Sequence, residues 1–192
     1  TERGRERFRG IERADSVTLD PHKGMFLPYG TGCLLVREGR RLLDAHATGE
    51  ARYLQDLALE GESLNFSDYS PELSRDFRGL RVWLPLKLHG WEAFREALDE
   101  KLDLARLLHE GIRDAPGIEV PWEPELSIVA FRSTDGEEAS KEVLERINAS
   151  QQIFLSSTMI KGRFTLRAAI LSFRTHRDRI EEAIEIIRSA AG

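Results

Sequence analysis

Short, nearly continuous apolar runs alternate with longer amphipathic segments along this chain of 192 residues. Residues 15–20, Asp-Ser-Val-Thr-Leu-Asp, have the pattern of a short strand that Pro21 ends, and Cys33-Leu34-Leu35-Val36 forms an apolar run behind Gly30-Thr31-Gly32. Runs of this length and continuity are typical of strands that are buried on both faces of an α/β sheet. The pattern therefore predicts two short strands joined by a turn that contains proline and glycine.

In the middle of the chain, the apolar pattern is weak over residues 39–70 and becomes helical after them. The weak pattern predicts a long loop, and a loop of this length in a compact protein is usually functional or disordered. From Pro71 onward, apolar residues recur on one helical face until Pro85, where we expect a kink or a break. A second helical stripe begins at Trp91 and continues to Ile112.

The last third of the chain alternates between strand and helix signals. Apolar runs over residues 126–131 and 164–170 predict two strands. A helical pattern follows each run, and each helix is predicted to open with a capping pair, Thr134 with Glu137 and Thr175 with Asp178. Strands and helices of these lengths in alternation predict an α/β fold.

Composition narrows the classes of function. The net charge is -5, with 28 basic and 33 acidic residues mixed along the chain, so nucleic acid and anionic membranes are not expected as partners. No apolar run is long enough to cross a bilayer, and the charged N-terminus has no apolar signal segment behind it. A single cysteine, Cys33, fits a reducing compartment, so we expect a cytoplasmic protein. No spacing of cysteine and histidine predicts a metal site.

The tetrapeptide Asp20-Pro21-His22-Lys23 is the candidate for chemistry. Pro21 fixes the backbone where the first strand ends, so His22 and Lys23 project from a rigid turn. Burial of a lysine lowers the pKa of its ammonium group and yields the free amine that attacks an aldehyde. On composition alone, a lone lysine is more often a solvated surface charge.

The surrounding residues resemble a known family. Residues 14–26, Ala-Asp-Ser-Val-Thr-Leu-Asp-Pro-His-Lys-Gly-Met-Phe, are similar to the cofactor-lysine segment of the group II pyridoxal-phosphate-dependent decarboxylases. Further similarities follow in that family's order, at Tyr53-Leu54, at residues 75–83 and at residues 164–167. The chain departs from the family's usual tryptophan at Gly24 and from its usual second arginine at Asp76.

The resemblance implies a fold and a site. The fold would be the α/β fold of aspartate aminotransferase (fold type I), with the C-terminal part of the large domain in residues 1–90 and a small domain in residues 91–192. The cofactor would be pyridoxal 5'-phosphate. The implied site residues are Lys23, which would form the imine with the cofactor, Asp20 and His22 beside the cofactor, Tyr53 as the acid that protonates Cα, and Arg167 and Ser74 toward the substrate. A structural ion pair is an equal alternative for Arg167, and packing of the turn for His22.

The resemblance also implies an activity and partners. The reaction would be decarboxylation of an L-amino acid, an aromatic one rather than an acidic one, in a homodimer whose active site lies at the subunit interface. Other cofactor groups of the family precede the lysine and are not in these residues, so we expect a fragment whose partner is the N-terminal portion of the same enzyme. The alternatives are oxidative deamination coupled to decarboxylation, which gives an aldehyde, and a non-catalytic oligomerisation module.

Overall fold

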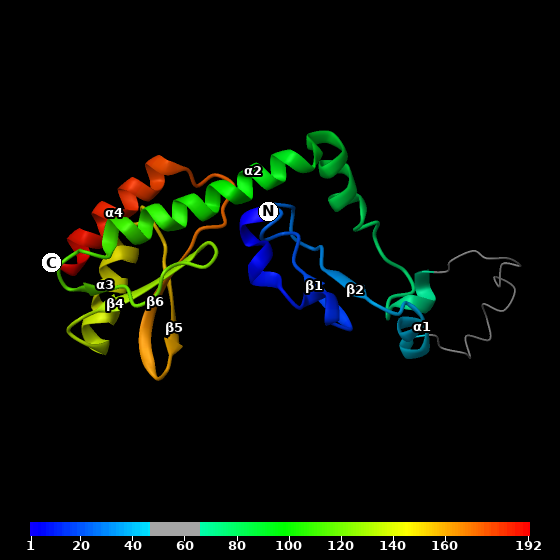
Figure 1. The fold of residues 1–192 in the computed structure, drawn as a ribbon, viewed down its shortest axis with the longest axis horizontal. Helices are drawn as coiled ribbons and strands as arrows, with labels where there is room; N and C mark the ends of the chain where they lie inside the picture. Colours follow the sequence, from blue (N-terminus) through cyan, green and yellow to red (C-terminus); the bar gives the residue numbers. More distant parts are fainter. Residues whose placement is uncertain (47–65) are drawn as a thin grey trace, which may run out of the picture. The chain divides into compact units, whose positions relative to one another are not determined.

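The computed structural model describes residues 1–46 and 66–192. These residues form two compact units, which are drawn in Figure 1. The C-terminal unit comprises Thr1–Arg7, Lys23–Phe26 and His89–Gly192, and the hairpin unit comprises Phe8–His22 and Leu27–Leu88. No helix among the described residues is both long and apolar enough to cross a membrane.

The hairpin unit is built on the two predicted strands. β1 (Ser16–Leu19) pairs antiparallel with β2 (Cys33–Val36), and Leu19 lies opposite Cys33. The prediction that β2 is buried on both faces is wrong for this structure, because Leu34 and Leu35 are 50% and 58% exposed. Two strands without a second layer cannot cover both of their own faces.

Short helical elements precede and follow this hairpin in the sequence. They are η1 (Glu2–Phe8) and η2 (Ile11–Arg13) before β1, and α1 (Arg40–His46) and η4 (Phe66–Tyr69) after β2. All of η1 except Phe8 belongs to the C-terminal unit. Arg37, the residue after β2, ties this hairpin to the chain before β1, because its guanidinium donates to the carbonyl of Ala14 at 3.0 Å. The backbone N–H of Arg37 also donates to the carbonyl of Asp15 at 2.9 Å.

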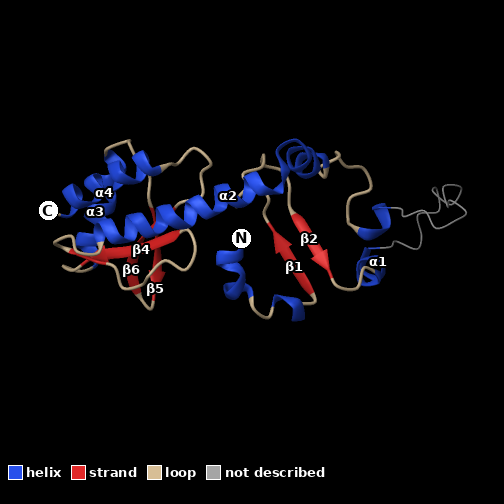
Figure 2. Cartoon of the chain, turned by 45° about the horizontal axis from the view of Figure 1, so that its top comes forward, coloured by secondary structure: helices blue, strands red, loops and turns tan. Residues whose placement is uncertain are grey.

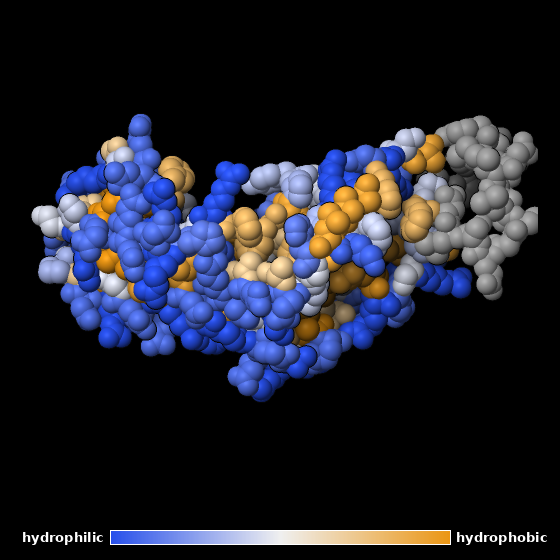
Figure 3. All heavy atoms as spheres, turned by 90° about the horizontal axis from the view of Figure 1, so that it is seen from above, coloured by the Kyte–Doolittle hydropathy of each residue, from blue (hydrophilic) through white to orange (hydrophobic). Residues whose placement is uncertain are grey.

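The long helix α2 (Leu80–Ile112) differs from the prediction at its start and at its break. Residues 71–79 are not helical, although Pro71 is a good first-turn residue. Pro85 is accommodated inside the helix, and the break occurs at Gly90, whose φ of 75° and ψ of 161° lie outside the helical region. Glycine reaches this backbone conformation without the steric cost that a side chain would add. Residues of high hydropathy reach the surface on the face drawn in Figure 3. In the first turns of α2, the exposed apolar side chains are Leu80, Trp83, Leu84 and Leu88.

The C-terminal unit contains a four-stranded antiparallel sheet in the order β3-β4-β6-β5. Its strands are β3 (Ile118–Glu119), β4 (Ile128–Ser133), β5 (Ser156–Ile160) and β6 (Arg163–Ala169). The predicted strands at 126–131 and 164–170 correspond to β4 and β6, whereas β3 and β5 carry too weak an apolar pattern to be predicted. Helices α2, α3 (Glu137–Ala149) and α4 (Arg177–Ala191) cover one side of the sheet (Figure 2).

The core lies between these helices and the sheet. Every second residue of β6 faces it, so that Leu166 and Ala168 are buried while Arg167 is exposed. The other buried contributors come from α2, β4, α3 and α4, and include Leu104, Leu108, Ile112, Val129, Phe131, Val143, Ile147, Ile180, Ile184 and Ile187. Both helices α3 and α4 form as predicted, but neither of their N-caps makes a side-chain hydrogen bond, so both predicted capping pairs are wrong.

Charged side chains join three strands at one edge of this sheet. Glu119 on β3 accepts hydrogen bonds from Arg132 on β4 and from Arg163 on β6, the latter at 2.6 Å. The Arg132 guanidinium also lies 5.5 Å from the centroid of the Trp122 ring, which is a cation–π distance. The hydrogen bond from Arg132 lowers the pKa of the Glu119 carboxyl below its usual 4.5 and outweighs the opposing effect of desolvation.

Gly111 allows α2 and α4 to approach closely. A Cβ atom at this position would lie 2.7 Å from Cγ1 of Ile184, which is itself buried in the core. We therefore expect Gly111→Ala to lower the free energy of unfolding by about 1–3 kcal/mol through overpacking, although the higher helix propensity of alanine alone would raise it by about 1 kcal/mol. Denaturant titration followed by circular dichroism measures the change.

Gly39→Ala is the matched control, because a Cβ atom there would meet nothing within 4 Å. Its free energy of unfolding should stay within about 0.5 kcal/mol of that of the parent protein. Equal stability of the two variants would contradict the close approach of Gly111 and Ile184.

Candidate functional site

The predicted chemical residue lies in an ordered turn between β1 and β2. The backbone N–H of Phe26 donates to the carbonyl of Lys23 at 3.1 Å, and that of Leu27 donates to the carbonyl of Pro21 at 3.2 Å. These bonds fold residues 21–27 into successive tight turns. The Lys23 side chain is exposed on this turn, so the described residues do not bury it as we expected. What they do provide is a fixed backbone from which its amine projects.

His22 is held on the hairpin side of the same turn. Its ring lies 4.8 Å from the ring of Tyr29, centroid to centroid, and its Nδ1 lies 3.2 Å from the carbonyl oxygen of Thr31. The Thr31 side chain is only 4% exposed, and its Oγ1 has no hydrogen-bond partner among the described residues. A buried hydroxyl with unused hydrogen-bonding capacity is uncommon in folded proteins.

Arg81, in the first turn of α2, donates hydrogen bonds to the backbone of residues 29 and 30. Its Nη1 lies 3.3 Å from the carbonyl oxygen of Gly30 and 3.5 Å from that of Tyr29. Gly30 has a φ of +85°, and a Cβ atom on it would lie 2.7 Å from Nη1 of Arg81. Glycine is therefore favoured at position 30 both by the backbone conformation and by the approach of the guanidinium.

Asp76, one of the two departures from the family pattern, orients Arg81. Its Oδ2 accepts from Nη2 of Arg81 at 2.7 Å, and its Oδ1 accepts from Nε of Arg78 at 2.9 Å. Glu72 completes the network by accepting two hydrogen bonds from Arg78, and this pairing raises the pKa of the Arg78 guanidinium. The carboxylate at position 76 thus links two arginines of the segment 75–83.

Gly24, the other departure, is not required by the backbone of the turn. It belongs to the C-terminal unit, and a Cβ atom on it would meet only Cδ2 of Leu98, at an ordinary contact distance of 3.8 Å. Its φ does not lie in the left-handed region, in contrast to that of Phe26, which is 56°. The glycine at position 24 leaves room beside Leu98.

The remaining predicted residues lie in separate elements. Asp20 is exposed at the end of β1, and Ser74 is exposed in the extended segment before α2. Arg167 is on β6, on the strand face opposite Leu166, as its position in the pattern predicted. Tyr53 lies outside the described residues. The contributions of Thr31 and Arg81 were not predicted, and the only sequence signals for them were the flanking glycines 30 and 32 and the arginine-rich segment itself.

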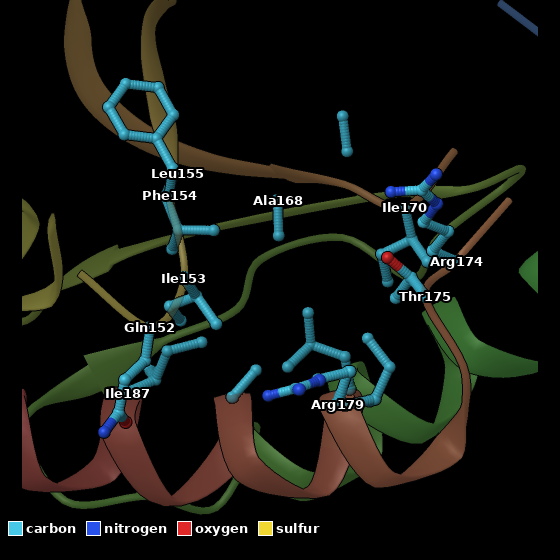
Figure 4. A pocket seen from close by; sticks show the side chains of 14 residues that line it. Gln152, Ile153, Phe154, Leu155, Ala168, Ile170, Arg174, Thr175, Arg179 and Ile187 are labelled. Atoms are coloured by element: carbon cyan, nitrogen blue, oxygen red, sulfur yellow. The ribbon is translucent and has the colours of Figure 1, made fainter. Parts of the chain in front are cut away.

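A cavity of about 330 Å³ opens in the C-terminal unit between α4 and the residues that precede β5 (Figure 4). Its walls are mainly apolar, with Phe154 and Ile170 among them, and Arg174 and Arg179 are its charged lining residues. None of the predicted site residues lines it. No group of three or more potential metal ligands occurs in the part of the chain that the structure describes.

Known proteins resemble this chain along nearly its whole length. A sequence profile described as the pyridoxal-dependent decarboxylase conserved domain matches residues 2–134. An aromatic-L-amino-acid decarboxylase of Bacillus atrophaeus is 35% identical over 201 residues, which cover 100% of this chain and 42% of that protein. A phenylacetaldehyde synthase of Arabidopsis thaliana is 27% identical over 195 residues, covering 97% of this chain and 40% of that protein.

A solved structure agrees with these sequence matches. The crystal structure of the Oryza sativa enzyme TDC with PLP and tryptamine superimposes with a TM-score of 0.90 at 25% identity. The superposition covers 99% of this chain and 41% of the other. The chain thus spans about two-fifths of the length of these relatives.

Proposed function

Since the chain belongs to the pyridoxal-dependent decarboxylase family, we propose that the protein decarboxylates an L-amino acid to the amine and carbon dioxide with pyridoxal 5'-phosphate. The observation that carries the proposal is Lys23, projecting from a hydrogen-bonded turn in a segment that resembles the family's cofactor-lysine segment. An aromatic substrate is favoured, because the relatives include an aromatic-L-amino-acid decarboxylase and a structure that holds tryptamine.

The described residues fit the cofactor. A lysine on a fixed turn offers the amine group that covalent attachment of an aldehyde requires. The neighbouring His22 offers an aromatic ring with polar nitrogens, and the buried Thr31 hydroxyl has unused hydrogen-bonding capacity. The chain covers only about two-fifths of its relatives, and in this proposal the N-terminal portion of the same enzyme would supply the other walls of the site.

Lys23 would hold the cofactor, because the unprotonated Nζ of a lysine is a nucleophile that can bind an aldehyde covalently. When bound, the cofactor would supply an electron sink for the cleavage of the bond from Cα to the carboxylate. His22 and Asp20 would flank the cofactor, in line with the arrangement implied by the resemblance.

Three further residues would act on the substrate. Tyr53 would donate its phenolic proton to Cα after carbon dioxide has left, which commits the product to the amine. Arg167 presents a planar guanidinium on the exposed face of β6, where it could bind a carboxylate through two hydrogen bonds. Ser74 would face the substrate ring.

The proposed function also implies how the domains and subunits of the enzyme are arranged. Residues 1–90 would form the C-terminal part of the large domain, with the catalytic loop over about residues 39–70, and residues 91–192 would form the small domain. The enzyme would be a cytoplasmic homodimer with the active site at the subunit interface, completed by the N-terminal portion of the same enzyme. The apolar residues exposed on β2 and on the first turns of α2 are consistent with surfaces that such an assembly covers.

Borohydride reduction tests the attachment directly. The enzyme that contains this chain is loaded with pyridoxal phosphate, reduced and digested, and the modified peptide is identified by mass spectrometry. We expect the label on Lys23, because its amine projects from the turn described above, and loss of the label in Lys23→Arg with little change in stability.

Lys87→Arg is the control, since Lys87 is also an exposed lysine, although it lies in the hairpin unit, and its substitution should leave the label unchanged. A label that never appears on Lys23 would favour the alternative of a non-catalytic module.

An aldehyde-forming reaction is the second candidate, because a phenylacetaldehyde synthase is among the relatives. Tyr53 distinguishes the two reactions, since protonation of Cα is what yields the amine. We expect Tyr53→Phe to convert the main product from amine to aldehyde, measured by chromatography of both products with and without oxygen. The conservative control is Tyr69→Phe, which lies outside the proposed chemistry. An amine yield equal to that of the parent would refute the role of Tyr53.

A further inference from the structure

Residues Lys23–Phe26 group with the C-terminal unit, although the chain on either side of them belongs to the hairpin unit. Two packing observations account for this grouping. Position 24 lies beside Leu98 of α2, and the ring of Phe26 lies 5.9 Å from the ring of Phe173, centroid to centroid, at an interplanar angle of 56°. The turn that carries the lysine therefore packs against the segment between β6 and α4.

Phe26 adopts a conformation that needs outside support. Its φ is 56°, in the left-handed region that a bulky side chain rarely occupies. Its N–H nevertheless donates to the carbonyl of Lys23 at 3.1 Å, so this unusual conformation closes the turn behind the lysine. Such strained residues persist where the surroundings determine their position.

The segment that presents Phe173 is itself anchored. The N–H of Thr175 donates to the carbonyl of Ser172 at 3.2 Å, which closes a tight turn around Phe173. The carbonyl of Thr175 accepts from Nζ of Lys101 at 2.6 Å, and the side chain of Lys101 is only 1% exposed. A buried ammonium group that has lost its water depends on such partners, so this bond fixes the segment to α2.

Glu100 and His176 add a second attachment at the same place. Glu100 lies 2.8 Å from Nζ of Lys101 through Oε2 and 2.7 Å from Nδ1 of His176 through Oε1. Burial acts to raise the pKa of the Glu100 carboxyl, but the hydrogen bonds from Lys101 and His176 outweigh it, and the pKa is lowered. Two consecutive residues of α2 thus hold two consecutive residues of the segment 172–176.

We propose that Phe173 is a positioning residue for the cofactor lysine. Its ring, presented by the anchored segment 172–176, supports Phe26 and so fixes the turn from which Lys23 projects. This inference rests on the proposed function, in which Lys23 carries the cofactor. It also assigns to the C-terminal unit the role of setting where the lysine amine lies.

Hydrogen exchange measures the support directly, without reference to turnover. In the cofactor-loaded enzyme, Phe173→Ala should raise the exchange rate of the Phe26 amide about three- to tenfold, the range that the loss of one aromatic contact allows. The same variant should shift the pH midpoint of the visible absorbance of the lysine-bound cofactor and weaken cofactor retention on dilution. Phe173→Tyr keeps the ring and should restore all three values.

Phe154→Ala is the matched control, because it removes an equal aromatic ring from the same unit at a site of similar exposure, 82% for Phe154 and 62% for Phe173. If Phe173→Ala does not fold, Phe173→Leu is measured in the same way. Equal exchange and equal absorbance midpoints in the Phe173 and Phe154 variants would overturn the proposal. Borohydride mapping of the parent separates the two claims: a label on another lysine refutes the proposed function, while the exchange rates still report whether Phe173 supports the turn.

Discussion

The backbone hydrogen bonds that close the turn after β1 are the constraint on which the account depends. A lysine side chain has four flexible bonds, so its amine reaches a defined point only if its own backbone is fixed. The bonds from Leu27 to Pro21 and from Phe26 to Lys23 provide that fixed point. Pro21 contributes by restricting the backbone just where the strand ends.

Two sets of side chains support this turn. On the hairpin side, Tyr29 packs against His22, and Arg81 donates to the carbonyl of Gly30. In the C-terminal unit, Phe173 packs against Phe26. The departure at Asp76 is explained by the first set, because its carboxylate orients Arg81 and also pairs with Arg78. The partners in these ion pairs are about half exposed, so the pairs add little to the free energy of unfolding. Their main effect is to orient the arginine side chains.

The parts of the fold that could be predicted are those set by local sequence. Strands β1, β2, β4 and β6 and helices α3 and α4 were predicted, because apolar residues recur in them with the period of the element. The start of α2 at Leu80 and its break at Gly90 were not predicted, because Pro71 and Pro85 are local signals that the surrounding structure overrides. The predicted caps are wrong because α3 begins after Gly136 and α4 begins after His176, so neither Thr134 nor Thr175 occupies the N-cap position.

The candidate site divides in the same way. Lys23 and His22 could be proposed as site residues because they are adjacent in a short, recognisable segment, and their roles stay predictions. Arg81, Thr31 and Phe173 could not, since their contacts join residues that are distant in sequence or depend on one backbone conformation. The sequence analysis expected a buried Lys23, but this lysine is exposed in the structure.

The most direct test of the central claim is an experimental structure of the cofactor-loaded enzyme. The account predicts continuous density from Nζ of Lys23 to the cofactor, with residues 21–27 in the turn described here. Continuous density to a different lysine, or a Lys23 amine directed into bulk solvent away from the cofactor, would contradict it.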